Sequence, residues 1–303
     1  MQTLSGFYES IFGCKTYKIS LDAGCTCPNR DGTKGKGGCI FCSENGSGDF
    51  VSERKLSIKE QVEQGKKLVE AKLRGRSGER QGKFIAYFQN FSSTYGDAAV
   101  LLAKYREALE CDGVEGLAVA TRPDCLCEEI LSGLADISKN HFVQIELGLQ
   151  TSNEQTGQFI NRCYTNEDYI DAVARIRKAA PSIHIVTHLI FGLPGETEED
   201  MMNSVKFVVD HAATVWGLKI TSLYIIKNTT LAQLYQAGSY QPLSKEEYFR
   251  LLEKALPLLP ENCVVHRLTG DPPKRLLIAP SWTTDKKRVL NDLLTLLKSH
   301  NKI

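Results

Sequence analysis

Three cysteines, Cys27, Cys39 and Cys42, have the residue type and spacing to hold an iron–sulfur cluster. Eleven residues separate the first two, and two residues separate the last two. Three thiolates can hold a [4Fe–4S] cluster in which one iron keeps no protein ligand, whereas four cysteines would saturate the cluster. A small molecule can bind and react at that open iron. The segment therefore predicts a reactive metal centre.

A structural zinc site is the alternative for this segment. Cys25 lies two residues before Cys27 and would complete a set of four thiolates, enough for a closed tetrahedral site. Cys125 and Cys127 form another close pair, for which a second cluster or a redox pair stays open. Bystander thiols are the commoner explanation for such a pair, and we expect the same of the remaining cysteines, Cys14, Cys111, Cys163 and Cys263.

Alternating apolar and amphipathic segments must position these cysteines. The apolar segments are rich in β-branched and aromatic residues, which is typical of buried parallel strands. They predict strands at residues 17–21, 84–88, 116–120, 142–149, 184–190 and 218–226. The amphipathic segments predict helices at residues 58–73, 98–109, 128–135, 167–179 and 198–211. Such an alternation predicts a parallel α/β sheet, and periodicity alone leaves open whether it is an open sheet or a curved partial barrel.

The pattern changes after about residue 230. Helical segments at 231–237 and 246–258 precede two short apolar segments and a last helix at 286–299. We therefore expect a main domain over residues 1–230, with a cluster loop at 22–43, and a C-terminal extension over residues 231–303 that packs on it.

The cysteine loop follows the first predicted strand. In a parallel α/β fold this places the loop at the carboxyl edge of the sheet, where active sites of such folds lie. Glycines at positions 32, 35, 37 and 38 let the backbone approach a bulky cofactor closely.

Composition excludes several classes of protein. The chain has 303 residues, 42% of them hydrophobic, and a net charge of +1, so it is not a broadly basic nucleic-acid binder. No apolar run approaches the roughly 20 residues that a membrane span needs, and the first residues do not resemble a signal peptide. We therefore expect a soluble, cytoplasmic protein without a membrane partner. Basic residues do gather between Arg54 and Lys83 and at 286–288, where phosphate binding or a solvated surface would explain them.

Several motifs recur in order along the chain and together resemble radical S-adenosylmethionine (SAM) enzymes, in the branch of the Elongator catalytic subunit and the bacterial YtqA/YhcC-type proteins. They are SLDAGCTCPNRDGTKGKGGCIFC, YFQNFSSTY, IELGLQT, HLIFGLPGET and RLTGDPPKRLLIAPSW. The resemblance covers nearly the whole chain. It implies an α/β fold, a partial (β/α)6 TIM-like barrel with a small C-terminal α/β extension, whose open top holds a [4Fe–4S] cluster and SAM.

The same resemblance implies roles for individual residues. Cys27, Cys39 and Cys42 would ligate the cluster, and Phe41 would pack on the adenine of SAM. Arg162 suits the SAM carboxylate because a guanidinium matches its geometry. The expected cofactor-binding residues are Phe41, Gln89, Glu146, Gln150, Arg162, His188, Gly192, Leu223 and Tyr224. A structural role stays open for two of them, with Glu146 as a buried carboxylate and Arg162 as its ion-pair partner.

The implied reaction starts when an electron from an external flavodoxin- or ferredoxin-type reductant cleaves SAM to a 5′-deoxyadenosyl radical. The branch implies tRNA as the partner and the C5 side chain of wobble uridine as the target, in the 5-methylaminomethyl-2-thiouridine pathway. Because only about seventy residues follow the barrel, we expect no acetyltransferase domain like that of the Elongator subunit. Two alternatives stay open: a radical SAM enzyme acting on a small metabolite, and a non-catalytic, metal-stabilised RNA-binding module.

Overall fold

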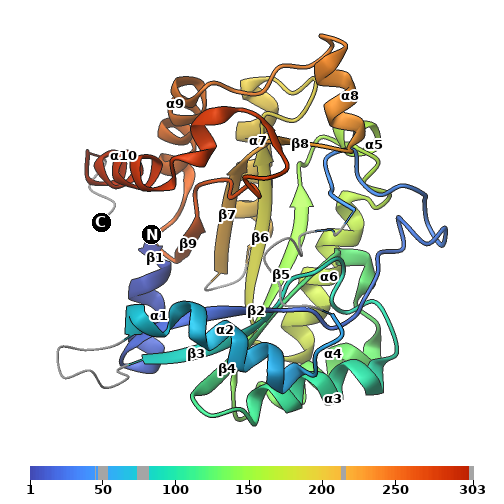
Figure 1. The fold of residues 1–303 in the computed structure, drawn as a ribbon, viewed down its shortest axis with the longest axis vertical. Coiled ribbons are helices and arrows are strands. Elements are labelled where there is room, and N and C mark those ends of the chain that lie inside the picture. The colour runs from blue at the N-terminus through green and yellow to red at the C-terminus, as the bar shows by residue number, and fades with distance from the viewer. Residues whose placement is uncertain (45, 47–53, 74–81, 213–215, 300–303) are drawn as a thin grey trace.

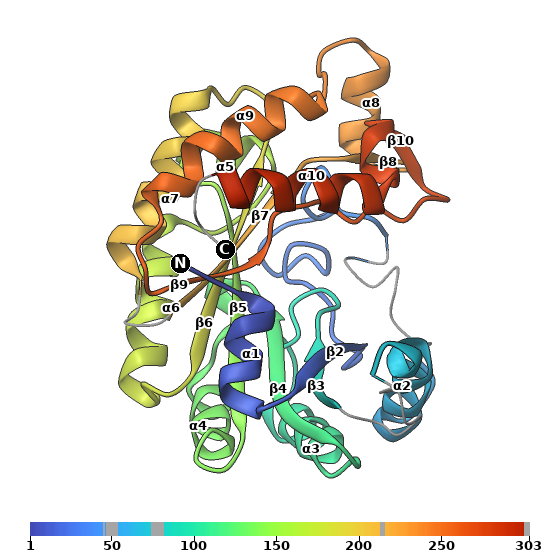
Figure 2. The same ribbon diagram turned by 90° about the vertical axis from the view of Figure 1, so that its left-hand side faces the viewer.

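Eight parallel strands form one curled sheet in the part of the chain that the computed structural model describes, residues 1–44, 46, 54–73, 82–212 and 216–299. The strands are β1 (Gln2–Thr3), β2 (Lys15–Leu21), β3 (Gly82–Phe88), β4 (Val114–Thr121), β5 (Phe142–Gln150), β6 (His184–Phe191), β7 (Trp216–Ser222) and β9 (Cys263–Arg267). Their order is β1-β9-β7-β6-β5-β4-β3-β2, and every neighbouring pair is parallel. Helices cover the outer face of the curl (Figure 1), and Figure 2 shows its open side.

The six predicted strands correspond to β2 through β7, and the predicted partial barrel is confirmed. The last predicted strand, residues 218–226, was too long. β7 ends at Ser222, and the backbone N–H of Leu223 then bonds to the carbonyl of Phe191 at 2.9 Å. The chain turns there, so that β8 (Ile225–Ile226) pairs antiparallel with β10 (Leu277–Ala279) in a separate small sheet.

Helices follow most strands and confirm the amphipathic segments. Their bounds are α1 (Leu4–Phe12), α2 (Ile58–Leu73), α3 (Ala98–Leu109), α4 (Glu128–Ile137), α5 (Glu154–Phe159), α6 (Asn166–Ala179), α7 (Glu198–His211), α8 (Thr230–Gln236), α9 (Lys245–Ala255) and α10 (Lys286–Ser299). Capping explains where several begin: Thr197, for example, accepts from the backbone of Asp200, whose carboxylate bonds back to the N–H of Thr197. α1 and α5 were not predicted from the sequence.

Alternation along the strands separates an apolar layer from a polar interior. On β5, Val143, Ile145 and Leu147 belong to the apolar core between the sheet and the helices. The residues between them point to the other face, because successive side chains of a strand alternate. Gln144 and Glu146 therefore lie inside the curl, and α1 closes its floor, where Tyr8 donates a hydrogen bond to Gln144 at 3.1 Å.

The C-terminal segment contributes a strand to the sheet and also packs on it. β9 lies between β7 and β1 in the same sheet, so residues far apart in the chain complete it. On α9, the buried Tyr248 donates to the carbonyls of Ile220 and Leu268 at 3.1 and 3.2 Å. The division of the chain near residue 230 stays a prediction.

Candidate active site

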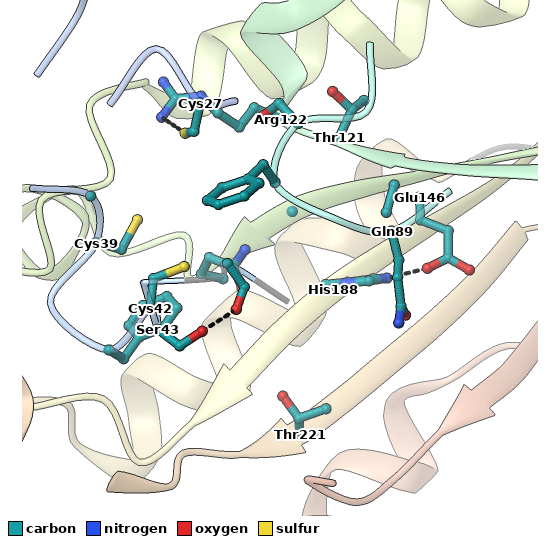
Figure 3. A pocket seen from close by; sticks show the side chains of 18 of the residues that line it. Cys27, Cys39, Cys42, Ser43, Gln89, Thr121, Arg122, Glu146, His188 and Thr221 are labelled. Carbon is teal, nitrogen blue, oxygen red and sulfur yellow. Dashed lines mark hydrogen bonds and ion pairs between the residues drawn. The ribbon is translucent and has the colours of Figure 1, made fainter. Parts of the chain in front are cut away.

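The thiols of Cys27, Cys39 and Cys42 line one cavity of about 430 Å³. All three lie on the loop that follows β2, at the carboxyl edge of the sheet, as the sequence predicts. Figure 3 shows them on one side of the cavity, and it shows Glu146 and His188 on the other. We call these regions the thiol end and the inner end of the cavity. The volume is within the range of small-molecule sites in proteins.

Asn29 holds the cysteine loop in shape. Its side chain is completely buried, and its amide N–H groups donate to Cys39 Sγ at 3.7 Å and to the carbonyl of Asn161. The backbone carbonyl of Asn29 accepts the N–H of Gly38 at 2.9 Å. Gly38 has φ of +80°, and a Cβ there would lie 2.8 Å from Arg30, so this position requires glycine. An amide donor to a ligating sulfur also tunes a cluster's potential.

Arg122 brings a positive charge to the thiol end. Its guanidinium is buried and donates to Cys27 Sγ at 3.9 Å and to the carbonyl of Arg162 at 3.1 Å. Asp124 orients it through two hydrogen bonds of 2.8 and 2.7 Å. Lys34 of the cysteine loop also pairs with Asp124, at 2.7 Å. The loop after β4 is therefore tied to the cysteine loop by charge.

The thiol end fits an iron–sulfur cluster. Burial and the neighbouring Cys42 and Cys27 raise the pKa of Cys39 to about 12, against smaller opposing effects of Arg122 and Asn29. Crowded thiols of this kind give up their protons to a cationic metal centre. Within the described ranges, no three His, Cys, Asp or Glu side chains gather closely enough for a single metal ion. Three thiols spread around a shared cavity suit a multi-iron group better than one zinc ion.

Cys25 lies outside this set. It is 5% exposed, belongs to the apolar core and does not line the cavity. Burial raises its pKa to about 11, which disfavours the thiolate that a metal would need. The zinc site that included Cys25 therefore does not match the geometry.

The pair Cys125 and Cys127 is also separate from the cavity. Cys125 is buried and points toward Asp124, with Sγ 3.7 Å from its carboxylate, whereas Cys127 is exposed before α4. Neither lines the cavity. Their geometry is that of bystanders.

The cavity brings together six of the nine predicted cofactor-binding residues. They are Phe41, Gln89, Glu146, Gln150, His188 and Tyr224. They come from the cysteine loop, from the ends of β3, β5 and β6 and from the turn after β7, which are far apart in the sequence. Their predicted contacts with SAM stay predictions.

Arg162, Gly192 and Leu223 do not line the cavity. The guanidinium of Arg162 is fully buried and donates to the carbonyls of Leu149 and Thr151 at 3.0 and 2.6 Å, so it shapes the turn after β5. Gly192 packs against Leu243, which a Cβ there would approach to 2.9 Å. Leu223 belongs to a small apolar cluster against which Phe41 packs, so it supports the cavity wall from behind.

Glu146 organises the inner end. Its carboxylate has no exposed surface and accepts hydrogen bonds from side chains on five strands. Oε1 accepts from Lys18 and Gln144, both at 2.5 Å, and Oε2 accepts from Tyr87 at 2.5 Å, from His188 at 2.8 Å and from Lys219. Its ion-pair partners are thus two lysines, and the pairing of Glu146 with Arg162 that the sequence left open as an alternative is not observed, because Arg162 pairs with Glu154.

Burial sets the protonation of this cluster. Burial alone would raise the pKa of Glu146, but Lys18, Lys219 and the hydrogen bond from His188 hold it well below its usual range. Burial lowers the pKa of Lys219 to about 7, with Lys18 and Arg267 adding to the effect of burial and Glu146 opposing it. Burial also lowers the pKa of His188 to about 4, so this ring is neutral near pH 7 and its Nε2–H donates to Glu146.

Several cavity residues were missed from the sequence. Arg122 directly follows β4, and a polar residue at a strand end was the available signal. Lys219 is the one charged residue of the apolar strand β7. Burying an unpaired charge costs free energy, so this position was a signal that Lys219 has a partner. Tyr87 carried no comparable signal. Of the basic segment 54–83, the residues Arg74, Arg76 and Arg80 lie outside the described residues.

Comparison with protein-family models gives two matches. The model of the Radical SAM superfamily matches residues 27–208, and that of the Radical_SAM C-terminal domain matches residues 215–299. The first match contains the three cysteines and every strand from β3 to β6. The second begins one residue before β7. Among the helices of the described ranges, none is both long and apolar enough for a membrane span.

Three curated proteins and one solved structure are similar to the chain. The uncharacterized protein YtqA of Bacillus subtilis is 39% identical over 95% of this chain and 86% of its own length. Protein YhcC of Escherichia coli K12 is 31% identical over 95% of this chain and 89% of its own length. The tRNA-2-methylthio-N(6)-dimethylallyladenosine synthase of Acetivibrio thermocellus is 29% identical over 61% of this chain and 38% of its own length. The archaeal Elp3 of Methanocaldococcus infernus has the same fold, with a TM-score of 0.64 and 14% sequence identity. The match covers 95% of this chain and 64% of the Elp3 chain.

Proposed function

The chain belongs to the radical SAM superfamily, in the Elp3-like branch that includes YtqA and YhcC, and we propose that it modifies the C5 side chain of wobble uridine in tRNA. The observation that carries this proposal is the shared cavity, in which three thiols of one loop face a polar inner end. Radical chemistry needs a cluster site and a substrate site in one cavity, because the radical must form beside the carbon that it attacks.

The cofactors of the family are a [4Fe–4S] cluster and SAM, which supply when bound a 5′-deoxyadenosyl radical that takes one hydrogen atom. In our proposal Cys27, Cys39 and Cys42 hold the cluster, and Phe41 packs on the adenine. Arg122 and Asn29 hold two of the sulfurs in place by N–H···S contacts. The apolar cluster behind Phe41 keeps water from that wall of the cavity.

Support for tRNA comes from the relatives. The name of the A. thermocellus relative says that it acts on tRNA, and it shares 29% identity with 61% of this chain. The Elp3-like fold and the sequence motifs place this chain in the branch from which the sequence predicted wobble uridine. The exposed Lys59 and Lys67 on α2 are a further feature consistent with a phosphate backbone.

We propose a specific reaction, the conversion of a carboxymethylaminomethyl group to an aminomethyl group. The carbon between the side-chain nitrogen and the carboxylate would lose one hydrogen atom to the 5′-deoxyadenosyl radical, which becomes 5′-deoxyadenosine. The carbon radical would then lose a proton to solvent and one electron to the oxidised flavodoxin- or ferredoxin-type carrier, and this electron offsets the one spent on SAM. The resulting imine takes up water and splits into the aminomethyl group and glyoxylate, so that atoms and electrons balance.

The modified nucleosides of a deletion strain test this function. We expect its tRNA to accumulate the carboxymethylaminomethyl form of wobble uridine and to lose the forms made from the aminomethyl group, as measured by mass spectrometry of digested tRNA. Wild-type protein should restore the profile, and the Cys39→Ala variant should not. A normal profile in the deletion strain would contradict the proposal and leave a small-metabolite substrate as the alternative.

A further inference from the structure

Two cations face the inner end of the cavity from neighbouring strands. Lys219 on β7 and Arg267 on β9 both line the cavity, and they are direct partners in the register of these two strands. Lys18 lies behind them on β2, with Nζ 2.5 Å from Glu146. The sheet therefore gathers three positive side chains from strands that are distant in the sequence.

These cations exceed the negative charge that faces them. The single charge of Glu146 is shared between Lys18 and Lys219, and His188 is neutral. Asp271 also lines the cavity, but its carboxylate is paired with Lys286 at 2.6 Å. Over the described ranges, no hydrogen bond or ion pair engages the guanidinium of Arg267. Lys219 is buried, Lys18 is half-buried and Arg267 is exposed at the end of β9, and such an excess of cations attracts an anion into the cavity.

The free donors of Lys219 and Arg267 suit a carboxylate by their chemistry. An ammonium has three N–H donors, and those of Lys219 meet Glu146 and Tyr87, the latter at 3.2 Å, so one donor is left toward the cavity among the described contacts. The planar guanidinium of Arg267 offers two parallel donors, which match the two oxygens of a carboxylate. Lys219 is itself fixed by Glu146 and Tyr87, so it is positioned before a ligand arrives.

We propose that Lys219 and Arg267 form a binding subsite for a carboxylate on the substrate. This inference rests on the proposed function, in which the side chain of the substrate ends in a carboxymethyl group. A carboxylate held at the inner end leaves the adjacent carbon pointing back toward the thiol end, where the hydrogen atom must be removed. The subsite would thus select carboxylated side chains and set the position of attack.

Binding of paired RNAs to the cluster-reconstituted protein tests the subsite. The probes are two anticodon stem-loops that differ only at C5 of U34, one with a carboxymethylaminomethyl group and one with an aminomethyl group. We expect the wild-type protein to bind the carboxylated RNA roughly tenfold or more tightly, the effect of losing one charge-assisted contact. Arg267→Gln should remove this preference, with little effect on the aminomethyl RNA.

Lys274→Gln is the matched control. Lys274 is exposed in the same segment and does not line the cavity, so its loss should leave the preference unchanged. The affinity for SAM, measured on the same samples, separates the two carboxylates that the cavity could receive. We expect Arg267→Gln to change the affinity for SAM by less than about twofold. A loss of SAM affinity with an unchanged RNA preference would overturn the proposal and assign the cations to SAM.

The outcome of the RNA-binding experiment is independent of the nucleoside profile of the deletion strain. Equal binding of the two RNAs by the wild-type protein would overturn the subsite, even if the deletion strain accumulates the carboxymethylaminomethyl form. A normal nucleoside profile in that strain would instead overturn the proposed function, whatever the RNA preference. The two failures are therefore distinguishable.

Discussion

The two ends of the cavity are built in different ways. The thiol end is built on one segment of the chain, residues 22–43 after β2, held by backbone hydrogen bonds and by Asn29 and Arg122. The inner end is assembled from side chains on five or more strands, which meet because the sheet curls. Its ion pairs join protein side chains to one another, whereas the raised pKa of Cys39 disfavours the thiolate unless a metal centre binds. The thiol end therefore depends on a metal centre, and the inner end depends on the fold.

Glu146→Gln should disrupt the inner end and cause the largest loss of folding stability. The substitution leaves Lys18 and Lys219 buried without a carboxylate, and removing one partner of a buried ion pair costs about 3–5 kcal/mol. Chemical denaturation of the protein would measure this loss. Glu128→Gln, which removes an exposed partner of Arg175, should cost less than about 0.5 kcal/mol. If the difference between the two ends holds, folded Glu146→Gln protein still takes up iron, and loss of iron uptake by that folded protein would contradict the comparison.

Arg122→Gln should weaken the thiol end without unfolding the protein. It removes the guanidinium contact to Cys27 Sγ, and the loss of such outer contacts lowers metal affinity by about 10–100-fold. Iron content after competition with a chelator would measure the change. Lys34→Gln removes the exposed partner of the same Asp124 and should be close to wild type. Equal iron retention in the two variants would show that Arg122 has no special role.

Anion binding at the inner end should weaken as the pH rises. The pKa of Lys219 is lowered to about 7 by burial, so the side chain is cationic below this pH and neutral above it. The groups that face it are Lys18, Tyr87, Glu146, His188 and Arg267. Among them, His188 stays neutral and Glu146 stays ionised across this range, because their pKa values lie lower.

Affinity for the carboxylated stem-loop, measured relative to the aminomethyl one, should therefore fall by up to about tenfold between about pH 6 and about pH 8. Lys219→Met should flatten this dependence. A preference for the carboxylated RNA that grows with pH would contradict the assignment.

Cys25→Ala should have the smallest effect of all. Cys25 belongs to the apolar core and not to the cavity, so its removal leaves a small void costing about 1 kcal/mol. Iron content and SAM cleavage should stay within about twofold of wild type. A loss of iron as large as that in Cys42→Ala would make Cys25 a ligand and revive the four-thiolate site.

The sequence predicted the parts of the molecule that are continuous in the chain. Apolar strands such as β3 and β6 and the triad of cysteines each lie in one segment, so composition and spacing identify them. The place of β9 between β7 and β1 depends on contacts across more than 200 residues, which no local pattern encodes. Lys219 was missed for the same reason, since its partners Tyr87 and Glu146 lie on other strands. Arg162 suited a carboxylate by its type, but the fold directs its donors to backbone carbonyls.

Cleavage of SAM by the reconstituted protein tests the central claim, that the thiol end generates the radical. The protein would be purified without oxygen, loaded with iron and sulfide, reduced with dithionite and given SAM, and 5′-deoxyadenosine would be measured. We predict that wild type and Cys25→Ala form this product and that Cys39→Ala does not. Wild-type protein with an intact, reduced cluster and no 5′-deoxyadenosine would contradict the account.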